Sequence, residues 1–148
     1  MGREVLHTLD TTPDLTPVGG VDIQIADSSL LLANGGSLPL FTDIQEAIQV
    51  TQPQVMVDFT TASSSIIAAQ HAIPFKVHQV IGTTGLNSKD LGSLDALAQE
   101  HGVGVIVAPN FALGAGASIV AMGSIPLVIN HWKHIGFAAN LYCESSEN

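Results

Sequence analysis

Three loops that follow apolar segments of this sequence have residue types suited to holding a flat polar ligand. They read Asp58-Phe59-Thr60-Thr61, Gly82-Thr83-Thr84-Gly85 and Ala108-Pro109-Asn110-Phe111. Glycine lets a ligand approach backbone N–H and C=O groups closely, and threonine hydroxyls donate and accept hydrogen bonds without charge. This composition favours a nicotinamide or adenine ring over a metal ion, whereas each loop alone also fits an ordinary strand-to-helix turn.

A further polar position is Asp22, which follows the apolar segment 15–21. An acidic residue at the end of such a strand commonly accepts hydrogen bonds from the ribose hydroxyls of a dinucleotide, and a solvated turn aspartate is the alternative. The next residues, Ile23-Gln24-Ile25, include no arginine or lysine that would pair with a 2′-phosphate. The sequence therefore predicts NADH or NADPH as the cofactor, with NADH favoured.

Other kinds of site find little support in the sequence. The segment His131-Trp132-Lys133-His134 has two histidines but no acidic or cysteine partner nearby, so it is weak evidence for a metal. We interpret Asp58 as a hydrogen-bonded structural carboxylate rather than a catalytic acid, and His78 as a solvated or capping residue. The chain contains no P-loop, Ser-His-Asp set or cysteine cluster. We therefore predict no metal site and assign no catalytic residue.

The composition excludes several classes of protein. The 148 residues are 46% hydrophobic and 11% charged, which indicates one folded domain rather than a disordered chain. Four Lys+Arg against thirteen Asp+Glu give a formal charge of -9, so we expect neither nucleic acid nor a membrane surface as a partner. A single cysteine, Cys143, excludes an internal disulfide and indicates a reducing compartment. Residues 103–130 lack charged side chains, but prolines and glycines interrupt them, so we favour a strand, a loop and a helix over a membrane span.

Alternating strands and helices would bring the three loops together. Apolar runs predict strands at 55–59, 77–81 and 103–107, and helical spacing predicts helices at 63–71 and 88–101. Parallel strands with right-handed crossovers place their carboxyl ends at one edge of the sheet. The predicted fold class is therefore α/β, with a Rossmann-like parallel sheet and helices on both faces. In these helices the residues expected to face inward are Ile66, Ile67, Ala69, Leu91, Leu94, Leu97 and Ala98, and Gly102 closes the second helix.

The remaining segments are less regular. We expect a helix over 1–9, a loop over 23–39 with a turn at Asn34-Gly35-Gly36, and a helix that Thr42 caps. Its buried stripe is Ile44, Ala47 and Ile48. A helix can also begin at Ala115, while residues 130–148 fit no element.

The loops resemble those of the dihydrodipicolinate reductase (4-hydroxy-tetrahydrodipicolinate reductase) family of bacterial and plant lysine biosynthesis. The similar segments are Val57-Asp58-Phe59-Thr60, residues 80–85 and residues 108–114, in the order and spacing of that family. Met1-Gly2-Arg3 resembles the end of its GxxGRMGR fingerprint, and residues 18–22 resemble its second strand with the ribose carboxylate. The resemblance covers residues 1–114.

The resemblance implies a dinucleotide-binding domain and hydride transfer from NAD(P)H to a cyclic imine-type substrate. It also implies a cytoplasmic enzyme (plastidic if the source is a plant) that forms a tetramer at full length. Asp22 would accept the ribose hydroxyls, Phe59 and Thr60 would line the adenine-ribose side, and the later loops would face the nicotinamide. The cofactor-binding residues carried over by position are Met1, Gly2, Asp22, Phe59, Thr60, Gly82, Thr83, Thr84, Ala108, Pro109, Asn110 and Phe111.

The sequence also departs from the family pattern. The family's first strand and glycine turn have no counterpart before Met1, and residues 115–148 do not match its E-x-H-H-x-x-K-x-D-x-P-S-G-T stretch. We therefore expect a partial dinucleotide-binding domain over 1–114 without the substrate domain, with weak cofactor binding and no catalysis. The slot beside the strands at Val18 and Val57 would stay open and cause self-association, unless residues 124–130 filled it. The alternatives are a non-catalytic nucleotide-binding paralogue and another Rossmann-type dehydrogenase, such as one acting on aspartate or homoserine derivatives.

Overall fold

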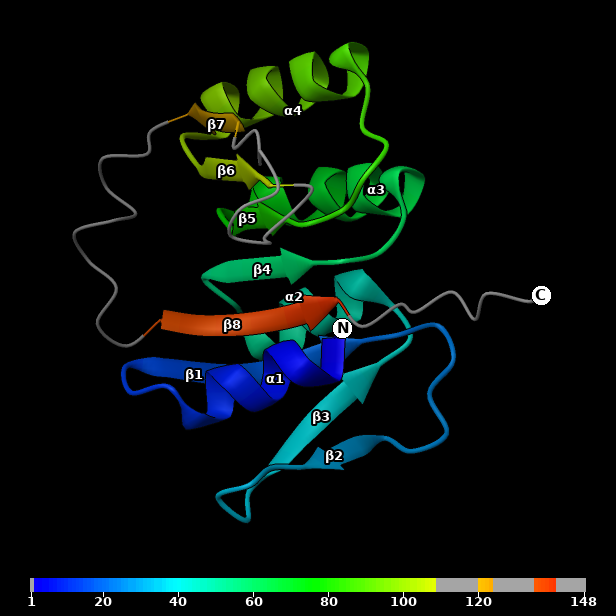
Figure 1. Cartoon of the computed structure of the whole chain (residues 1–148), viewed down its shortest axis with the longest axis vertical. Coiled ribbons are helices and arrows are strands. Elements are labelled where there is room, and N and C mark those ends of the chain that lie inside the picture. Colours follow the sequence, from blue (N-terminus) through cyan, green and yellow to red (C-terminus); the bar gives the residue numbers. More distant parts are fainter. Residues whose placement is uncertain (1, 109–119, 124–134, 141–148) are drawn as a thin grey trace, which may run out of the picture.

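The computed structural model describes residues 2–108, 120–123 and 135–140 of the chain (Figure 1). Their strands form one sheet in the order β2-β3-β1-β8-β4-β5-β6-β7. The strands are β1 Leu15–Val21, β2 Ser29–Leu31, β3 Ser37–Phe41, β4 Val55–Asp58, β5 His78–Ile81, β6 Gly104–Val107, β7 Val120–Gly123 and β8 Ile135–Asn140. The helices are α1 Gly2–Thr11, α2 Ile44–Thr51, α3 Ala62–Ala72, the 3-10 turn η1 Ile73–Phe75, and α4 Ser88–His101.

The sheet is parallel except at its two edges. The six inner strands are parallel to one another; they are β3, β1, β8, β4, β5 and β6. The edge strands β2 and β7 pair antiparallel with β3 and β6. The fold class predicted from the sequence, an α/β sheet of Rossmann type, is confirmed. The parallel direction brings the ends of β1, β4, β5 and β6 to one edge, where the predicted ligand-binding loops begin.

β8 lies in the middle of the sheet although it is the last described strand in the chain (Figure 1). Its Ala139 pairs with Gly20 of β1 on one side and with Val57 of β4 on the other. In the doubly wound strand order 3-2-1-4-5-6, this central position normally belongs to the first strand.

The position of β8 corrects two predictions. The slot is neither open nor filled by residues 124–130, because residues 135–140 pair on both sides of it. The expected self-association depended on an open slot, so this ground for it is removed. The prediction that residues 130–148 fit no element is also wrong for these six positions. The segment Ile-Gly-Phe-Ala-Ala-Asn has no charged residue, as suits a strand with neighbours on both sides.

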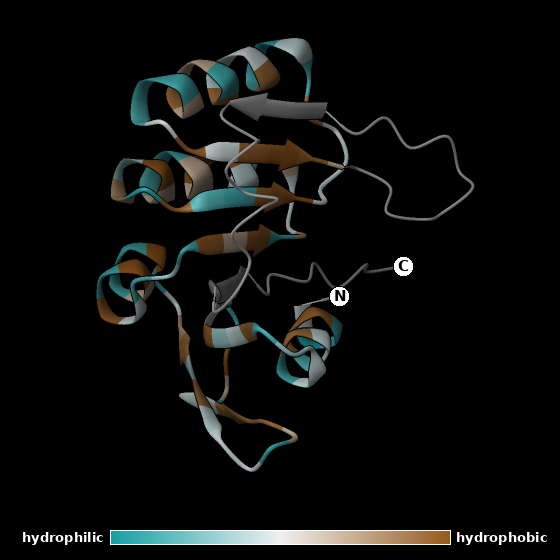
Figure 2. Cartoon of the chain, turned by 90° about the vertical axis from the view of Figure 1, so that its left-hand side faces the viewer, coloured by the Kyte–Doolittle hydropathy of each residue, from teal (hydrophilic) through white to brown (hydrophobic). Residues whose placement is uncertain are grey.

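Helices cover both faces of the sheet (Figure 2). The side chains of β4 alternate between the two faces and show which helices pack on each. Met56 packs with Ile48 of α2 and Ala68 of α3. Its neighbours Val55 and Val57 point to the opposite face and pack with Leu9 of α1. A second apolar cluster fixes α3 and α4 on β5 and β6; it contains Ala69, Ile73, Ile81, Leu94, Ala98, Val103, Val105 and Val107.

The segment predicted as a loop over 23–39 contains a hairpin instead. β2 and β3 pair antiparallel, with Leu30 opposite Leu38, and the predicted turn between them is confirmed by Gly35 at φ +83°. The leucines pack against Leu6 of α1, which stabilises strands too short for a clear sequence pattern. The carboxylate of Asp10 accepts hydrogen bonds from the backbone N–H of Ala33 (2.7 Å) and the Asn34 side chain (2.8 Å), so the hairpin turn is anchored to α1.

Two details of the helices differ from the sequence prediction. Asp43, not Thr42, caps α2, because the Asp43 carboxylate accepts a hydrogen bond from the Glu46 backbone N–H at 2.8 Å. In α3, Ile67 is 55% exposed, and Ala68 takes the inner position expected for it. The predicted span of α4 and its closure at Gly102 are confirmed. Residues 120–123 form β7 rather than part of a helix from Ala115, because their backbone pairs with β6.

Candidate functional site

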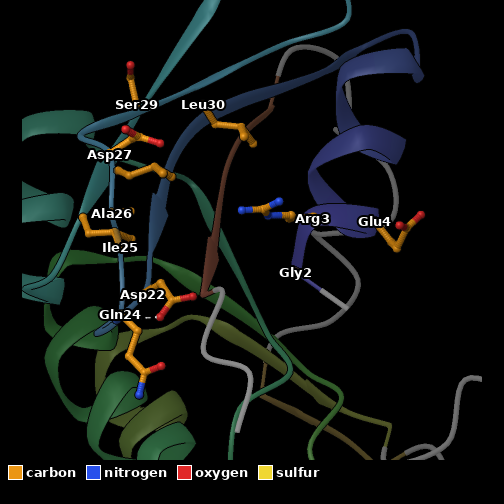
Figure 3. Close-up of a pocket in the computed structure, with 11 residues that line it drawn as sticks. Gly2, Arg3, Glu4, Asp22, Gln24, Ile25, Ala26, Asp27, Ser29 and Leu30 are labelled. Carbon is orange, nitrogen blue, oxygen red and sulfur yellow. Dashed lines mark hydrogen bonds between the residues drawn. The ribbon is translucent and has the colours of Figure 1, made fainter. Parts of the chain in front are cut away.

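A pocket of about 440 Å³ lies between the N-terminus of α1 and the segment that follows β1 (Figure 3). This volume is in the range of small-molecule sites. The pocket is open at the carboxyl end of β1, where parallel sheets of this type bind ligands. Its lining consists of Gly2, Arg3, Glu4, Asp22, Gln24, Ile25, Ala26, Asp27, Ser29, Leu30 and Leu40.

Asp22 is fixed at the mouth of this pocket by a local turn. It directly follows β1, and its Oδ1 accepts a hydrogen bond from the backbone N–H of Gln24 at 2.8 Å. The backbone N–H of Asp22 donates to the carbonyl oxygen of Phe41 at the end of β3. The carboxylate points toward the space between the strand end and α1 (Figure 3). A carboxylate held in this way can accept hydrogen bonds from a pair of hydroxyl groups.

The opposite wall of the pocket is the first turn of α1. Gly2 is buried there, and the Arg3 side chain extends toward the pocket while Glu4 points away from it (Figure 3). The free N–H groups of a first helical turn, together with a guanidinium, attract an anion. Sequence reasoning did not assign a ligand role to Arg3. Its position one residue after Gly2, at the start of a predicted helix, was the available signal.

The ends of β4, β5 and β6 form a second part of the same edge. The backbone N–H of Gly82 donates to the carbonyl oxygen of Asp58, and the N–H of Ala108 donates to the carbonyl oxygen of Ile81, both at 2.8 Å. Side-chain bonds link the first two loops, since Thr83 Oγ1 donates to the carbonyl oxygen of Thr60 at 3.0 Å. The three loops are thus tied to one another in the order of their strands.

Within this edge, side chains divide into buried anchors and exposed groups. Asp58 is fully buried, and its Oδ1 accepts a hydrogen bond from the Thr60 backbone N–H at 2.7 Å, so it is the satisfied structural carboxylate we predicted. The Thr83 side chain is also buried, whereas Thr84 is exposed and Gly82 is half-buried. A ligand at this edge would therefore meet backbone groups and the Thr84 hydroxyl rather than an ionised side chain.

The predicted site residues separate into two groups in space. Gly2 and Asp22 line the pocket beside α1. Phe59, Thr60, Gly82, Thr83, Thr84 and Ala108 lie at or directly after the ends of β4, β5 and β6. Phe59 is half-buried and packs against the apolar cluster of Leu9, Val55 and Val57. Met1, Pro109, Asn110 and Phe111 lie outside the described residues, as do the histidines of the 131–134 segment.

The described ranges contain neither a metal cluster nor a membrane-spanning helix. No group of three His, Cys, Asp or Glu side chains among residues 2–108 is arranged to hold a metal ion. Across the part of the chain that the structure describes, no helix has the length and apolar character needed to span a membrane.

Comparisons with known proteins identify relatives of this chain. The family model described as "Dihydrodipicolinate reductase, N-terminus" matches residues 1–111. A 4-hydroxy-tetrahydrodipicolinate reductase of Dehalococcoides mccartyi is 47% identical over 116 residues, which are 78% of this chain and 44% of the relative. One from Bacillus velezensis is 37% identical over 137 residues, 91% of this chain and 50% of the relative.

A solved structure agrees with these sequence relatives. Dipicolinate-bound dihydrodipicolinate reductase from Paenisporosarcina sp. TG-14 superposes with a TM-score of 0.64 at 30% identity, covering 77% of this chain and 44% of that one. The chain thus spans about half the length of the relatives it matches. The Bacillus alignment covers 91% of the chain and so includes residues after 114, where we expected the resemblance to end. The domain boundary at 114 stays a prediction.

Proposed function

Because this chain belongs to the dihydrodipicolinate reductase family, we propose that it binds NADH or NADPH along the carboxyl edge of its sheet. The observation that carries this proposal is the pocket in which the first turn of α1, the Arg3 side chain and the Asp22 carboxylate meet. The family domain is a pyridine-nucleotide domain, and the relatives are reductases.

The adenosine half of the cofactor fits the pocket beside α1. The pyrophosphate would lie at the N-terminus of α1, where backbone N–H groups and Arg3 supply positive potential. The ribose hydroxyls would donate to Asp22, whose turn with Gln24 leaves Oδ2 available in the direction of the pocket. Leu30 and Leu40 provide apolar lining for a base.

We propose that NADH is preferred over NADPH. The Asp22 and Asp27 carboxylates line the pocket, against the single positive charge of Arg3. A 2′-phosphate on the ribose would face the Asp22 carboxylate, and like charges at close range repel. We assign the Arg3 guanidinium to the pyrophosphate, because it belongs to the helix wall rather than the ribose wall.

The nicotinamide half would extend to the ends of β4, β5 and β6. Gly82, Thr83 and Thr84 would present backbone groups to the carboxamide, with Ala108, Pro109, Asn110 and Phe111 beside them. When bound, the reduced cofactor supplies a hydride to a cyclic imine-type substrate. The chain's own residues at this edge would orient the ring and exclude water from one of its faces.

We propose that these 148 residues alone bind the cofactor without turnover. Hydride transfer needs a positioned substrate and a proton donor, and we assign both to the part of the relatives that the alignments do not cover. A chain that binds without reacting would also fit the alternative of a non-catalytic nucleotide-binding protein. The relatives named here are bacterial, which favours a cytoplasmic over a plastid location. The tetramer implied for full-length relatives is not assigned to this chain.

Calorimetric titration with NADH and NADPH tests the proposal. We expect saturable binding of NADH, weaker binding of NADPH, and a loss of roughly tenfold in NADH affinity in Asp22→Ala, as for one hydrogen bond to a charged group. Glu100→Gln, which removes an equal charge from an exposed position on α4, should bind as wild type. Tighter binding of NADPH than of NADH, or an Asp22→Ala variant with unchanged NADH affinity, would contradict the proposal.

The absence of turnover is checked separately. The oxidation of NADH in the presence of a freshly prepared cyclic imine-type substrate should stay at the background rate for the 148-residue chain. Measurable turnover would contradict the proposal. If His131→Ala or His134→Ala then abolished that turnover, the segment 131–134 would be identified as the source of the proton.

A further inference from the structure

Three hydroxyl groups form a buried network beneath the loops that follow β4 and β5. Ser65 on α3 is 0% exposed, and its Oγ donates to Thr83 Oγ1 at 2.9 Å. Thr83 Oγ1 in turn donates to the carbonyl oxygen of Thr60 at 3.0 Å. The Thr60 hydroxyl lies 3.3 Å from Ser65 Oγ. Because Ser65 gives its one proton to Thr83, a bond at that last contact has Thr60 as its donor. The Thr60 hydroxyl also donates to the Thr61 carbonyl oxygen at 3.4 Å.

The identity of Ser65 stands out on its own helix. The other residues that α3 buries are Ala68, Ala69 and Ala72, so its fully buried positions hold small side chains. An alanine would fill the position of Ser65 equally well as packing. A hydroxyl at a fully buried position needs a hydrogen-bond partner, and here the partners belong to the two loops.

We propose that Ser65 is a positioning residue for the nicotinamide end of the cofactor, an inference that rests on the proposed function. Ser65 is too deeply buried to touch a ligand and acts through Thr83. Its hydrogen bond holds the Thr83 side chain inward, which leaves the backbone of Gly82 and Thr83 and the exposed Thr84 at the sheet edge. The same network bonds this loop to the loop after β4, so the two loops are held at a fixed distance from each other.

The test compares a ligand with the nicotinamide and one without it. NADH and ADP-ribose are titrated calorimetrically into the 148-residue chain and into Ser65→Ala. We expect the affinity for NADH to fall roughly fivefold to tenfold, as for one neutral hydrogen bond, and that for ADP-ribose to change by less than about twofold. Backbone hydrogen exchange of residues 82–85 without ligand should be faster in the variant.

Three further variants make the experiment selective. Thr83→Val keeps the shape of the side chain but removes both the bond from Ser65 and the bond to the Thr60 carbonyl oxygen, so it should show a selective loss at least as large as that of Ser65→Ala. The double variant should lose less affinity for NADH than the two single losses added together, because both variants remove the Ser65–Thr83 bond. Ser93→Ala is the matched control: this exposed serine bonds only the Lys89 carbonyl oxygen of its own helix among the contacts described, and both affinities should stay at wild-type values.

The results separate the inference from the proposal beneath it. Wild-type protein without saturable NADH binding would overturn the proposed function and the inference together. Intact NADH binding with an equal loss for both ligands, or with no loss in folded Ser65→Ala and Thr83→Val, would overturn the inference alone.

Discussion

The backbone N–H of Gly104, at the start of β6, donates a 2.8 Å hydrogen bond to Nδ1 of His78 on β5. An Nδ1 that accepts a bond carries no proton, so His78 is neutral in this arrangement. Burial also lowers the pKa of His78 below its ordinary value, because desolvation penalises the charged imidazolium. Protonation would thus break a contact between the neighbouring strands β5 and β6. The interpretation of His78 as a solvated or capping residue is therefore wrong, because its ring bonds the next strand of the sheet.

Acidification should destabilise the protein through His78. An unfolded histidine titrates near about pH 6.5. Below that pH the unfolded chain binds more protons than the folded one, so stability is fully present above it and is lost as pH falls through the lower folded pKa. Melting temperatures at about pH 7.5 and about pH 5.5 should differ less in His78→Gln than in wild type. The control His7→Gln, at an exposed position on α1, should keep the wild-type difference. An unchanged difference in His78→Gln would refute the assignment.

Asp58→Asn should lower the stability of the chain. The variant keeps the size of the side chain but replaces a carboxylate that accepts the Thr60 backbone N–H inside the protein. The asparagine oxygen can still accept this N–H but is uncharged, so we expect a loss of about 1–1.5 kcal/mol in the free energy of unfolding, the difference between a hydrogen bond to a charged group and one to a neutral group. Urea unfolding measures it. In the control Asp95→Asn, the carboxylate of the half-buried Asp95 accepts one solvent-exposed bond among the described contacts, from the Gln99 side chain. This variant should change stability by less than about 0.5 kcal/mol. Equal effects at both positions would contradict the argument.

The amides of β8 should be among the better protected in the chain. A strand with parallel partners on both sides has its backbone N–H groups bonded along its length, as β8 does with β1 and β4. Hydrogen exchange over residues 136–139 should therefore be as slow as over residues 55–58, and slower than over β2 at the sheet edge. Exchange at the rate of an unstructured peptide would show that β8 does not hold this position in solution.

Two glycines, one at the end of α4 and one inside it, should respond in opposite directions to alanine. Gly102 closes the helix at φ +63°, a conformation that costs an L-residue about 1–2 kcal/mol. Gly92 lies inside the helix with open space where the Cβ of an alanine would lie, so alanine should stabilise it by about 0.5–1 kcal/mol. Thermal unfolding of Gly102→Ala and Gly92→Ala distinguishes the two. A stabilising Gly102→Ala would show that the cap adopts another conformation.

Local sequence chemistry was sufficient for strands β4, β5 and β6 and for helix α4. The span of α4 follows from the capping pair Asn87 and Asp90 at one end and Gly102 at the other, all of which act within a few residues. Strands β4, β5 and β6 follow from continuous apolar runs, since parallel strands covered on both faces need no alternation. Asp22 could be placed at a strand end for the same reason. In each case the signal and the structure it specifies lie in the same short segment.

The centre of the sheet and the composition of the pocket were decided only by the tertiary structure. β8 has no period of its own that predicts a strand; it becomes one because the free edges of β1 and β4 offer unpaired N–H and C=O groups. Arg3 and Asp22 come together because α1 packs over the sheet with its N-terminus at the end of β1. Pairing and packing of this kind join residues that are far apart in the chain. The local spacing of side chains does not specify which distant strand a segment will pair with.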